Sequence, residues 1–201
     1  MKVSYVSEDG YDLTITKSNG IYTMSDSVGN TKKFNSSGML YEQQDLHGNK
    51  KTITYSNGRI DTVTHTPSGG TTTTQLSFTY NSTGALKNIT NAEDATEYVS
   101  FEYSTTPTGA VRPDNAGYLR KVTHSKGAGS CTYEYFSSGR LKHAIDSVTG
   151  TRILYQYNTT QNYSLQYAMV DSVTEYNSSD AMGQKISFIY GVETTAVRTS
   201  G

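Results

Sequence analysis

The sequence predicts an all-β protein, built as a repeat array of antiparallel β-hairpins. The first observation is an apolar residue followed at +2 and +4 by aromatic residues, which puts all three on one face of a strand. The second is a short polar turn that closes on glycine, two residues before an aliphatic residue. The third is that both patterns recur in phase, while no stretch keeps the 3.6-residue period of a helix.

The apolar–aromatic triplets mark the expected strands. They are Leu76, Phe78, Tyr80; Val99, Phe101, Tyr103; Cys131, Tyr133, Tyr135; Ile153, Tyr155, Tyr157; Ile186, Phe188, Tyr190; and the shorter Ile53, Tyr55. We expect these side chains to form a packed inner face of the sheet. Cys131 holds the first position of its triplet, so it is expected to pack as a small buried hydrophobe.

A tight hairpin turn is expected after each strand. The turns run from Phe34 to Gly38 and Leu40, from Tyr55 to Gly58 and Ile60, from Tyr80 to Gly84 and Leu86, and from Tyr135 to Gly139 and Leu141. Most of the intervening residues are Asn, Ser or Thr. Such residues hydrogen-bond their own main chain and are typical of hairpin turns.

A second turn is expected five residues beyond each aliphatic residue. That slot holds Asp45, His65, Asn91, His124 and Asp146, which we interpret as turn formers. One copy is therefore strand, turn, strand, turn, with 20 to 33 residues between successive aliphatic residues. The chain is expected to be a single repeat segment over residues 1–201, with clear copies at about 20–190 and loop insertions at 67–74 and 104–116.

Two stretches carry a resemblance to a known family. Residues 34–65 read FNSSGMLYEQQDLHGNKKTITYSNGRIDTVTH, and residues 133–157 read YEYFSSGRLKHAIDSVTGTRILYQY. This pattern resembles the tyrosine/aspartate (YD) repeats of the RHS family. The resemblance implies a long β-strand spiral that curls into a hollow shell, of which this chain would be an open segment. It also implies a large secreted or wall-associated bacterial protein, often with a C-terminal toxin inside the shell, whereas animal relatives act in cell adhesion.

The sequence departs from that family in two places. Self-cleaving RHS proteins have Asp-Pro in a core motif, and this chain contains no Asp-Pro. No toxin-like globular segment follows the last copy, so these residues do not indicate delivery of a toxin. We interpret the chain as an excised piece of a longer protein.

Composition excludes several classes of protein. A formal charge of −1 without a basic cluster argues against binding to nucleic acid. No run reaches the roughly 18 apolar residues of a membrane span. Residues 1–10 lack the basic and apolar regions of a signal peptide. We expect a secreted or cell-surface location, including the cell wall, with the signal outside this sequence.

Chemistry-bearing residues do not form a recognisable catalytic set. No nucleophile, base and orienting group cluster, so we expect no enzyme, no cofactor and no metal site. The turns at Asp26, Asp45 and Asp146 leave structural calcium as an alternative, although each supplies one carboxylate and a calcium loop gathers several. Glu93 and Asp94 are sequence neighbours and would point to opposite strand faces, which disfavours a carboxylate pair for glycoside hydrolysis.

Two functional hypotheses follow. The first is a structural scaffold or shell segment whose partners are the adjacent repeats of the parent protein and an enclosed toxin domain. The second is a carbohydrate-binding or cell-adhesion module that recognises cell-surface glycans. Its expected contacts are exposed tyrosines outside the triplets: Tyr41, Tyr118, Tyr163 and Tyr167.

Overall fold

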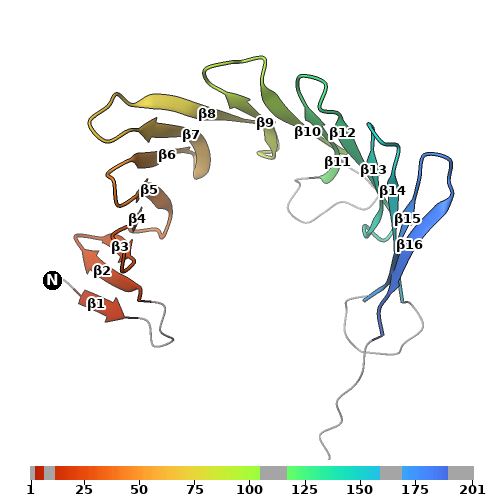
Figure 1. Ribbon diagram of the computed structural model, residues 1–201, viewed down its shortest axis with the longest axis horizontal. Helices are drawn as coiled ribbons and strands as arrows, with labels where there is room; N and C mark the ends of the chain where they lie inside the picture. The colour runs from red at the N-terminus through yellow and green to blue at the C-terminus, as the bar shows by residue number, and fades with distance from the viewer. Residues whose placement is uncertain (1–2, 7–11, 105–116, 159–168, 190–201) are drawn as a thin grey trace, which may run out of the picture. The chain divides into compact units, whose positions relative to one another are not determined.

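The computed structural model describes residues 3–6, 12–104, 117–158 and 169–189 (Figure 1). Within these ranges the chain forms sixteen β-strands in one sheet whose strand order follows the sequence from β1 to β16. Every strand pair with a described register is antiparallel, as in β2–β3 and β6–β7. The structure therefore confirms the all-β array of antiparallel hairpins.

The strands alternate regularly with turns along the chain. They are β1 (Val3–Val6), β2 (Thr14–Ser18), β3 (Ile21–Ser25), β4 (Thr31–Phe34), β5 (Leu40–Gln44), β6 (Lys50–Ser56), β7 (Arg59–Thr66), β8 (Thr73–Tyr80), β9 (Leu86–Asn91), β10 (Tyr98–Ser104), β11 (Tyr118–His124), β12 (Ser130–Tyr135), β13 (Leu141–Asp146), β14 (Arg152–Tyr157), β15 (Val170–Tyr176) and β16 (Met182–Ser187). No helix long and apolar enough to cross a membrane occurs in the described part of the chain.

Internal contacts divide the chain into two compact units, Met1–Ser100 and Phe101–Gly201. Strand β10 spans the boundary between them. Each unit is a run of hairpins in which consecutive strands lie next to one another. The organisation of residues 1–201 as a single repeat segment stays a prediction.

The first turn of the repeat has the expected construction. At residues 35–39, the amide of Asn35 donates to the carbonyl of Met39, and the amide of Gly38 donates to the carbonyl of Asn35, each at 2.9 Å. The Asn35 side-chain oxygen accepts the amides of Ser37 and Met39. Gly38 has a φ of +80°, which side chains of L-residues rarely adopt. Equivalent asparagine-centred turns occur at Asn81 and Asn177.

A β-bulge accompanies each turn of this kind. The register pairs the last aromatic of the strand with the aliphatic residue after the turn: Phe34 with Leu40, Tyr55 with Ile60, Tyr80 with Leu86, and Tyr135 with Leu141. The register shifts by one residue next to each of these pairs. The bulge therefore places the aromatic and the aliphatic residue opposite each other in these four copies.

The second turn uses aspartate in the same way. The amide of Asp45 donates to the carbonyl of Asn49 at 3.0 Å, and its carboxylate accepts the amides of His47 and Asn49 at 2.9 Å. Asp26 and Asp146 form comparable turns. His124 also begins a turn, since its amide donates to the carbonyl of Gly129.

The prediction for His65 is wrong. His65 lies inside β7, opposite Lys51 on one side and Thr73 on the other. Strand β7 extends to Thr66, so the turn begins only at Pro67, whose carbonyl accepts the amide of Gly70. The insertion expected at 67–74 is correspondingly shorter, because β8 already begins at Thr73. Most of the insertion expected at 104–116 lies outside the described residues.

The expected packed inner face is only half-buried. Among the described hydrophobic residues, Tyr118 alone is buried, with 7% of its surface exposed. The triplet residues Leu76 and Ile186 are 37% and 57% exposed, and Cys131 is half-buried rather than buried. The reason is that the described strands belong to one sheet, so no second sheet of described residues packs against the triplets.

Candidate functional site

The most regular feature of the molecule is a hydrogen bond from each of several repeats to the one before it. The bonds run from Tyr55 Oη to the carbonyl of Leu40 at 2.6 Å, from Tyr80 to Ile60 at 2.7 Å, from Tyr135 to Leu119 at 2.8 Å, and from Tyr157 to Leu141 at 3.0 Å. Each of these donors is the last aromatic of its strand, and each acceptor is the aliphatic residue near the start of a strand in the preceding repeat. Within the described residues, each unit contains two such bonds.

A second contact covers the ring of the same tyrosine. It comes from the residue between the turn glycine and the aliphatic residue of the preceding repeat. Arg59 lies 5.6 Å from the ring centre of Tyr80, and Arg140 lies 5.6 Å from that of Tyr157. Both distances are in the range of cation–π attraction. In a third copy this residue is Tyr118, whose ring lies 5.0 Å from that of Tyr135.

This second contact corrects the expectation for Tyr118. We expected an exposed tyrosine that could contact a glycan, yet the structure buries it to 7% exposure. Its hydroxyl also approaches Gly139 so closely that a Cβ atom there would lie 2.6 Å from it. The residue is buried because its position in the repeat faces the next hairpin, and it therefore presents no free aromatic surface.

Of the other three tyrosines expected to contact a glycan, the structure describes only Tyr41. Tyr41 is half-buried on β5. Tyr163 and Tyr167 lie outside the described residues. A glycan-binding role for Tyr41 stays a prediction.

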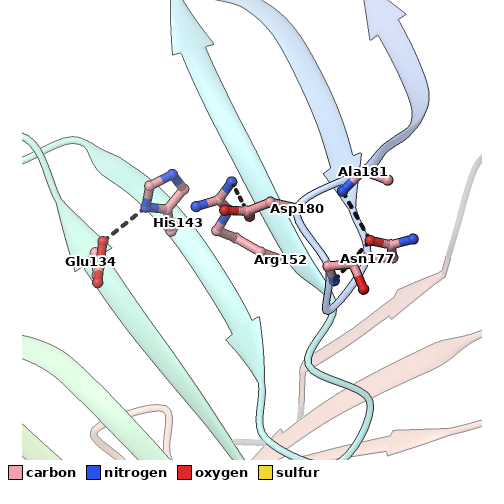
Figure 2. A network of polar contacts seen from close by, with 7 residues as sticks. Glu134, His143, Arg152, Asn177, Asp180 and Ala181 are labelled. Carbon is pink, nitrogen blue, oxygen red and sulfur yellow. Dashed lines mark hydrogen bonds and ion pairs between the residues drawn. The ribbon is translucent and has the colours of Figure 1, made fainter.

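Polar side chains of the second unit form a network along β12–β15 (Figure 2). His143 Nδ1 lies 2.8 Å from Glu134 Oε2, and Arg152 Nη2 lies 2.8 Å from Asp180 Oδ1. The hydrogen bond with His143 lowers the pKa of Glu134 below its ordinary value. His143 is 8% exposed, and the nearby strand β15 buries Ser172 and Thr174. The Glu134–His143 contact joins β12 to β13, and the Arg152–Asp180 ion pair joins β14 to the turn after β15.

This network was not predicted from the sequence. Glu134 and His143 are direct partners across the β12–β13 hairpin. The sequence contains a signal for this pair, because the turn places Tyr135 opposite Leu141, and Glu134 and His143 lie within two residues of them along the two strands. A regular hairpin would pair Glu134 with Lys142. The bulge shifts the register by one residue and pairs Glu134 with His143, and the sequence alone did not reveal this bulge.

Cys131 lies three residues before Glu134 on β12 and therefore belongs to the opposite face of the strand. It pairs with Val122 of β11 and Asp146 of β13. A hydrogen bond with Cys131, together with burial, raises the pKa of Tyr133 to about 12. A tyrosine with a raised pKa stays protonated near neutral pH, so Tyr133 does not act as a base there.

The described residues of the first unit line at least two hollows. One has a volume of about 540 Å³ and is lined by residues of β3 to β7 and of the aspartate turns, including Met24, Lys32, Gln43, Lys51 and His65. The other has a volume of about 500 Å³ and is mainly apolar, with Ile15, Tyr22, Met24 and Phe34 in its wall.

The aspartate turns give no support to the calcium alternative. The carboxylate of Asp45 accepts two main-chain amides and the side-chain amide of Asn49, and that of Asp26 accepts the corresponding groups of its own turn. These bonds lower the pKa of both aspartates. In the ranges that the structure describes, no three side chains of His, Cys, Asp or Glu converge as metal ligands would.

Comparison with known proteins gives structural neighbours alone. No protein-family model matches the chain, and no curated protein matches it. The chain resembles a TcdB2–TccC3–Cdc42 structure at 17% identity and a TM-score of 0.52, covering 76% of this chain and 7% of that one. It resembles the Photorhabdus luminescens Tc holotoxin pore at 13% identity and a TM-score of 0.55, covering 82% and 9%.

A third neighbour is TcdB2–TccC3 without its hypervariable C-terminal region, at 13% identity and a TM-score of 0.50, with coverage of 83% and 10%. The chain thus spans a tenth or less of each of these chains. At such identities the likeness concerns the fold. The chain has the strand-and-turn fold of these Tc toxin structures, in agreement with the RHS-type repeat that its sequence motif predicts.

Proposed function

We propose that this chain is a non-enzymatic structural segment of a shell or scaffold within a larger protein. The observation that carries the proposal is the tyrosine hydrogen bond that links a repeat to the preceding one in four equivalent places. In a repeat protein each copy contacts its neighbours, and the array creates an extended surface. Adjacent repeats are therefore the first partners of this segment.

The recurring polar residues support the same proposal. The asparagines and aspartates of the turns direct their side-chain oxygens to amides of their own turns. The arginines that precede the aliphatic residues cover tyrosines of the next copy. The recurring residues thus form the turns or connect successive copies of the repeat.

The wider role is part of the proposal. The structural neighbours include the pore of a Tc holotoxin, so we propose a toxin-associated shell in a secreted or cell-surface bacterial protein, with cell-wall association as one form. The alternative, a carbohydrate-binding or adhesion module, depends on Tyr41 among the described tyrosines proposed for it. A glycan array with the wild-type chain and with Tyr41→Ala tests that alternative: binding lost in the variant would support it.

Deletion of one complete repeat tests the scaffold proposal. Removing residues 35–55 joins Phe34 to the turn after Tyr55, so that β4 is followed by β7 and the alternation of strand directions is kept. Removing residues 35–45 deletes one strand, β5, together with the turn before it. Strand β4 is then followed by β6, and these two strands run in the same direction in the wild-type sheet.

The scaffold proposal expects different outcomes for these two deletions. The first variant should keep the β-sheet circular dichroism spectrum and a cooperative thermal transition. The second variant should lose the β-sheet signal and the cooperative transition of the first unit, because β4 and β6 cannot pair as antiparallel neighbours. If the complete-repeat deletion unfolds as fully as the half-repeat deletion, the repeats do not act as interchangeable structural units.

A further inference from the structure

The larger hollow of the first unit is crossed by a row of residues, one from each strand. The register places Met24 of β3 opposite Lys32 of β4, Lys32 opposite Gln43 of β5, Gln43 opposite Lys51 of β6, and Lys51 opposite His65 of β7. All five residues line the hollow. Neighbouring strands lie about 4.8 Å apart, so Lys32 and Lys51 start about 10 Å apart and their long side chains can converge on one group.

The lysines of this row make no polar side-chain contact with the described residues. Lys32 and Lys51 are exposed, and neither they nor His65 have a side-chain hydrogen bond or ion pair among the described residues. The residues next to them in sequence point to the other face of the sheet. There Lys33 and Lys50 pair with Glu42 at 2.7 Å and 3.5 Å. The two faces therefore differ: on one face lysines are paired with Glu42, whereas Lys32 and Lys51 in the hollow have no partner among the described residues.

The rim of the hollow carries acceptors as well. Asp26 and Asp45 line it beside the row, and each carboxylate already accepts three hydrogen bonds from its own turn. A carboxylate offers about four acceptor positions, so one remains for a hydroxyl group of a ligand. Gln43 adds an amide that can both donate and accept. The wall thus combines two cations with acceptors for hydroxyl groups.

We propose that this hollow binds a polyhydroxylated acid, with an oxyanion group at Lys32 and Lys51 and hydroxyl groups at Gln43 and the aspartate rim. The oxyanion is a carboxylate or a phosphate, and both accept hydrogen bonds from lysine. A volume of about 540 Å³ lies within the range of small-molecule sites. A neutral sugar would leave both lysines without a counter-charge and is expected to bind more weakly. Such a site goes beyond the scaffold role and does not depend on it.

Titration of the full chain tests the site. Glucuronate, glucose 6-phosphate and glucose are added to the wild-type protein, and binding is followed by calorimetry and by amide chemical shifts of β4 to β7. We expect saturable millimolar or tighter binding of at least one acid and at least about tenfold weaker binding of glucose. The acid that binds more tightly identifies the source of the oxyanion.

Matched variants separate a site from general charge. The pair Lys32→Gln/Lys51→Gln is expected to weaken binding by at least about tenfold. The control pair Lys87→Gln/Lys185→Gln removes the same net charge from exposed lysines outside the hollow and should leave binding unchanged. Lys32→Arg/Lys51→Arg should retain it. The proposal is overturned if neither acid binds saturably, if glucose binds as tightly, or if the control pair weakens binding equally.

Discussion

The hydroxyl group of Tyr80 donates a 2.7 Å hydrogen bond to the carbonyl of Ile60, while the neighbouring Arg59 lies 5.6 Å from the centre of the same ring. Two consecutive residues of one repeat thus contact one tyrosine of the next. The same pair of contacts holds Tyr157 through Leu141 and Arg140. In a sheet with little buried apolar surface, such contacts are expected to contribute directly to stability.

Tyr80→Phe removes the hydroxyl group and keeps the ring. We expect the free energy of unfolding to fall by about 0.5–1.5 kcal/mol, because the carbonyl of Ile60 loses its side-chain donor. Urea unfolding followed by circular dichroism measures the change. Tyr41→Phe is the control, since the Tyr41 hydroxyl has no hydrogen bond among the described residues. Equal losses in the two variants would show that the hydrogen bond contributes nothing specific.

Arg59 and Tyr80 are expected to be energetically coupled. A double-mutant cycle with Arg59→Gln and Tyr80→Leu should give a coupling energy of about 0.5–1 kcal/mol, the usual strength of an exposed cation–π contact. The control cycle combines Arg140→Gln with Tyr80→Leu, which belong to different units, and should give a value near zero. A coupling near zero in the first cycle would mean that Arg59 does not stabilise the ring.

Two turn glycines with similar backbone conformations should differ in their tolerance of alanine. Gly58 has a φ of +75°, and a Cβ atom added there would meet no described atom within 4 Å, so Gly58→Ala should cost about 1–2 kcal/mol of backbone strain. Gly117 has a φ of +77°, but a Cβ atom there would lie 2.8 Å from the main-chain carbonyl oxygen of Ser104. Gly117→Ala should therefore cost more. Thermal unfolding of both variants measures the difference, and equal costs would contradict the close approach.

Glu134 should make stability depend on pH. The hydrogen bond with His143 lowers the pKa of Glu134 below its ordinary value in the folded protein. The resulting stabilisation is present above the unfolded-state pKa and is lost as the pH falls through the lower folded-state pKa. Because the side chain is 45% exposed, Glu134→Gln should cost only about 0.2–1 kcal/mol near neutral pH.

That cost of Glu134→Gln should shrink toward zero as the pH is lowered past the folded-state pKa of Glu134. Urea unfolding of the wild type and of Glu134→Gln from neutral to acid pH measures this change in cost. Glu93→Gln, at an exposed turn position, is the control and should show no such trend. A wild-type advantage that stays constant through acid pH would contradict the proposed role of the His143 contact.

Local patterns were enough to predict the strands that carry the triplets and the turns of the repeat other than the one placed at His65. Period-2 spacing in Leu76, Phe78 and Tyr80 identifies a strand because alternate residues share a face. Asn81 and Gly84 identify the turn because the side chain of one bonds the local amides and the other adopts a positive φ. These signals depend only on residues that are close in sequence, so they can be recognised without the structure.

Contacts between repeats were harder to predict. Period 2 groups the residues of one face but does not say whether another layer covers that face, and the structure shows that triplet residues such as Leu76 stay partly exposed. Tyr118 was expected at the surface because it lies outside the triplets, although it occupies the position of Arg59 and Arg140 between a glycine and an aliphatic residue. The row from Lys32 to His65 also depends on registers across successive strand pairs, which the bulges set.

The central claim is that equivalent tyrosine hydrogen bonds hold repeats to the preceding ones in four places. The most direct measurement is the total free energy of unfolding of the quadruple variant with phenylalanine at Tyr55, Tyr80, Tyr135 and Tyr157. The bonds are separate and equivalent, so their losses should add to about 2–6 kcal/mol, summed over all transitions. A quadruple variant as stable as Tyr41→Phe would contradict the claim.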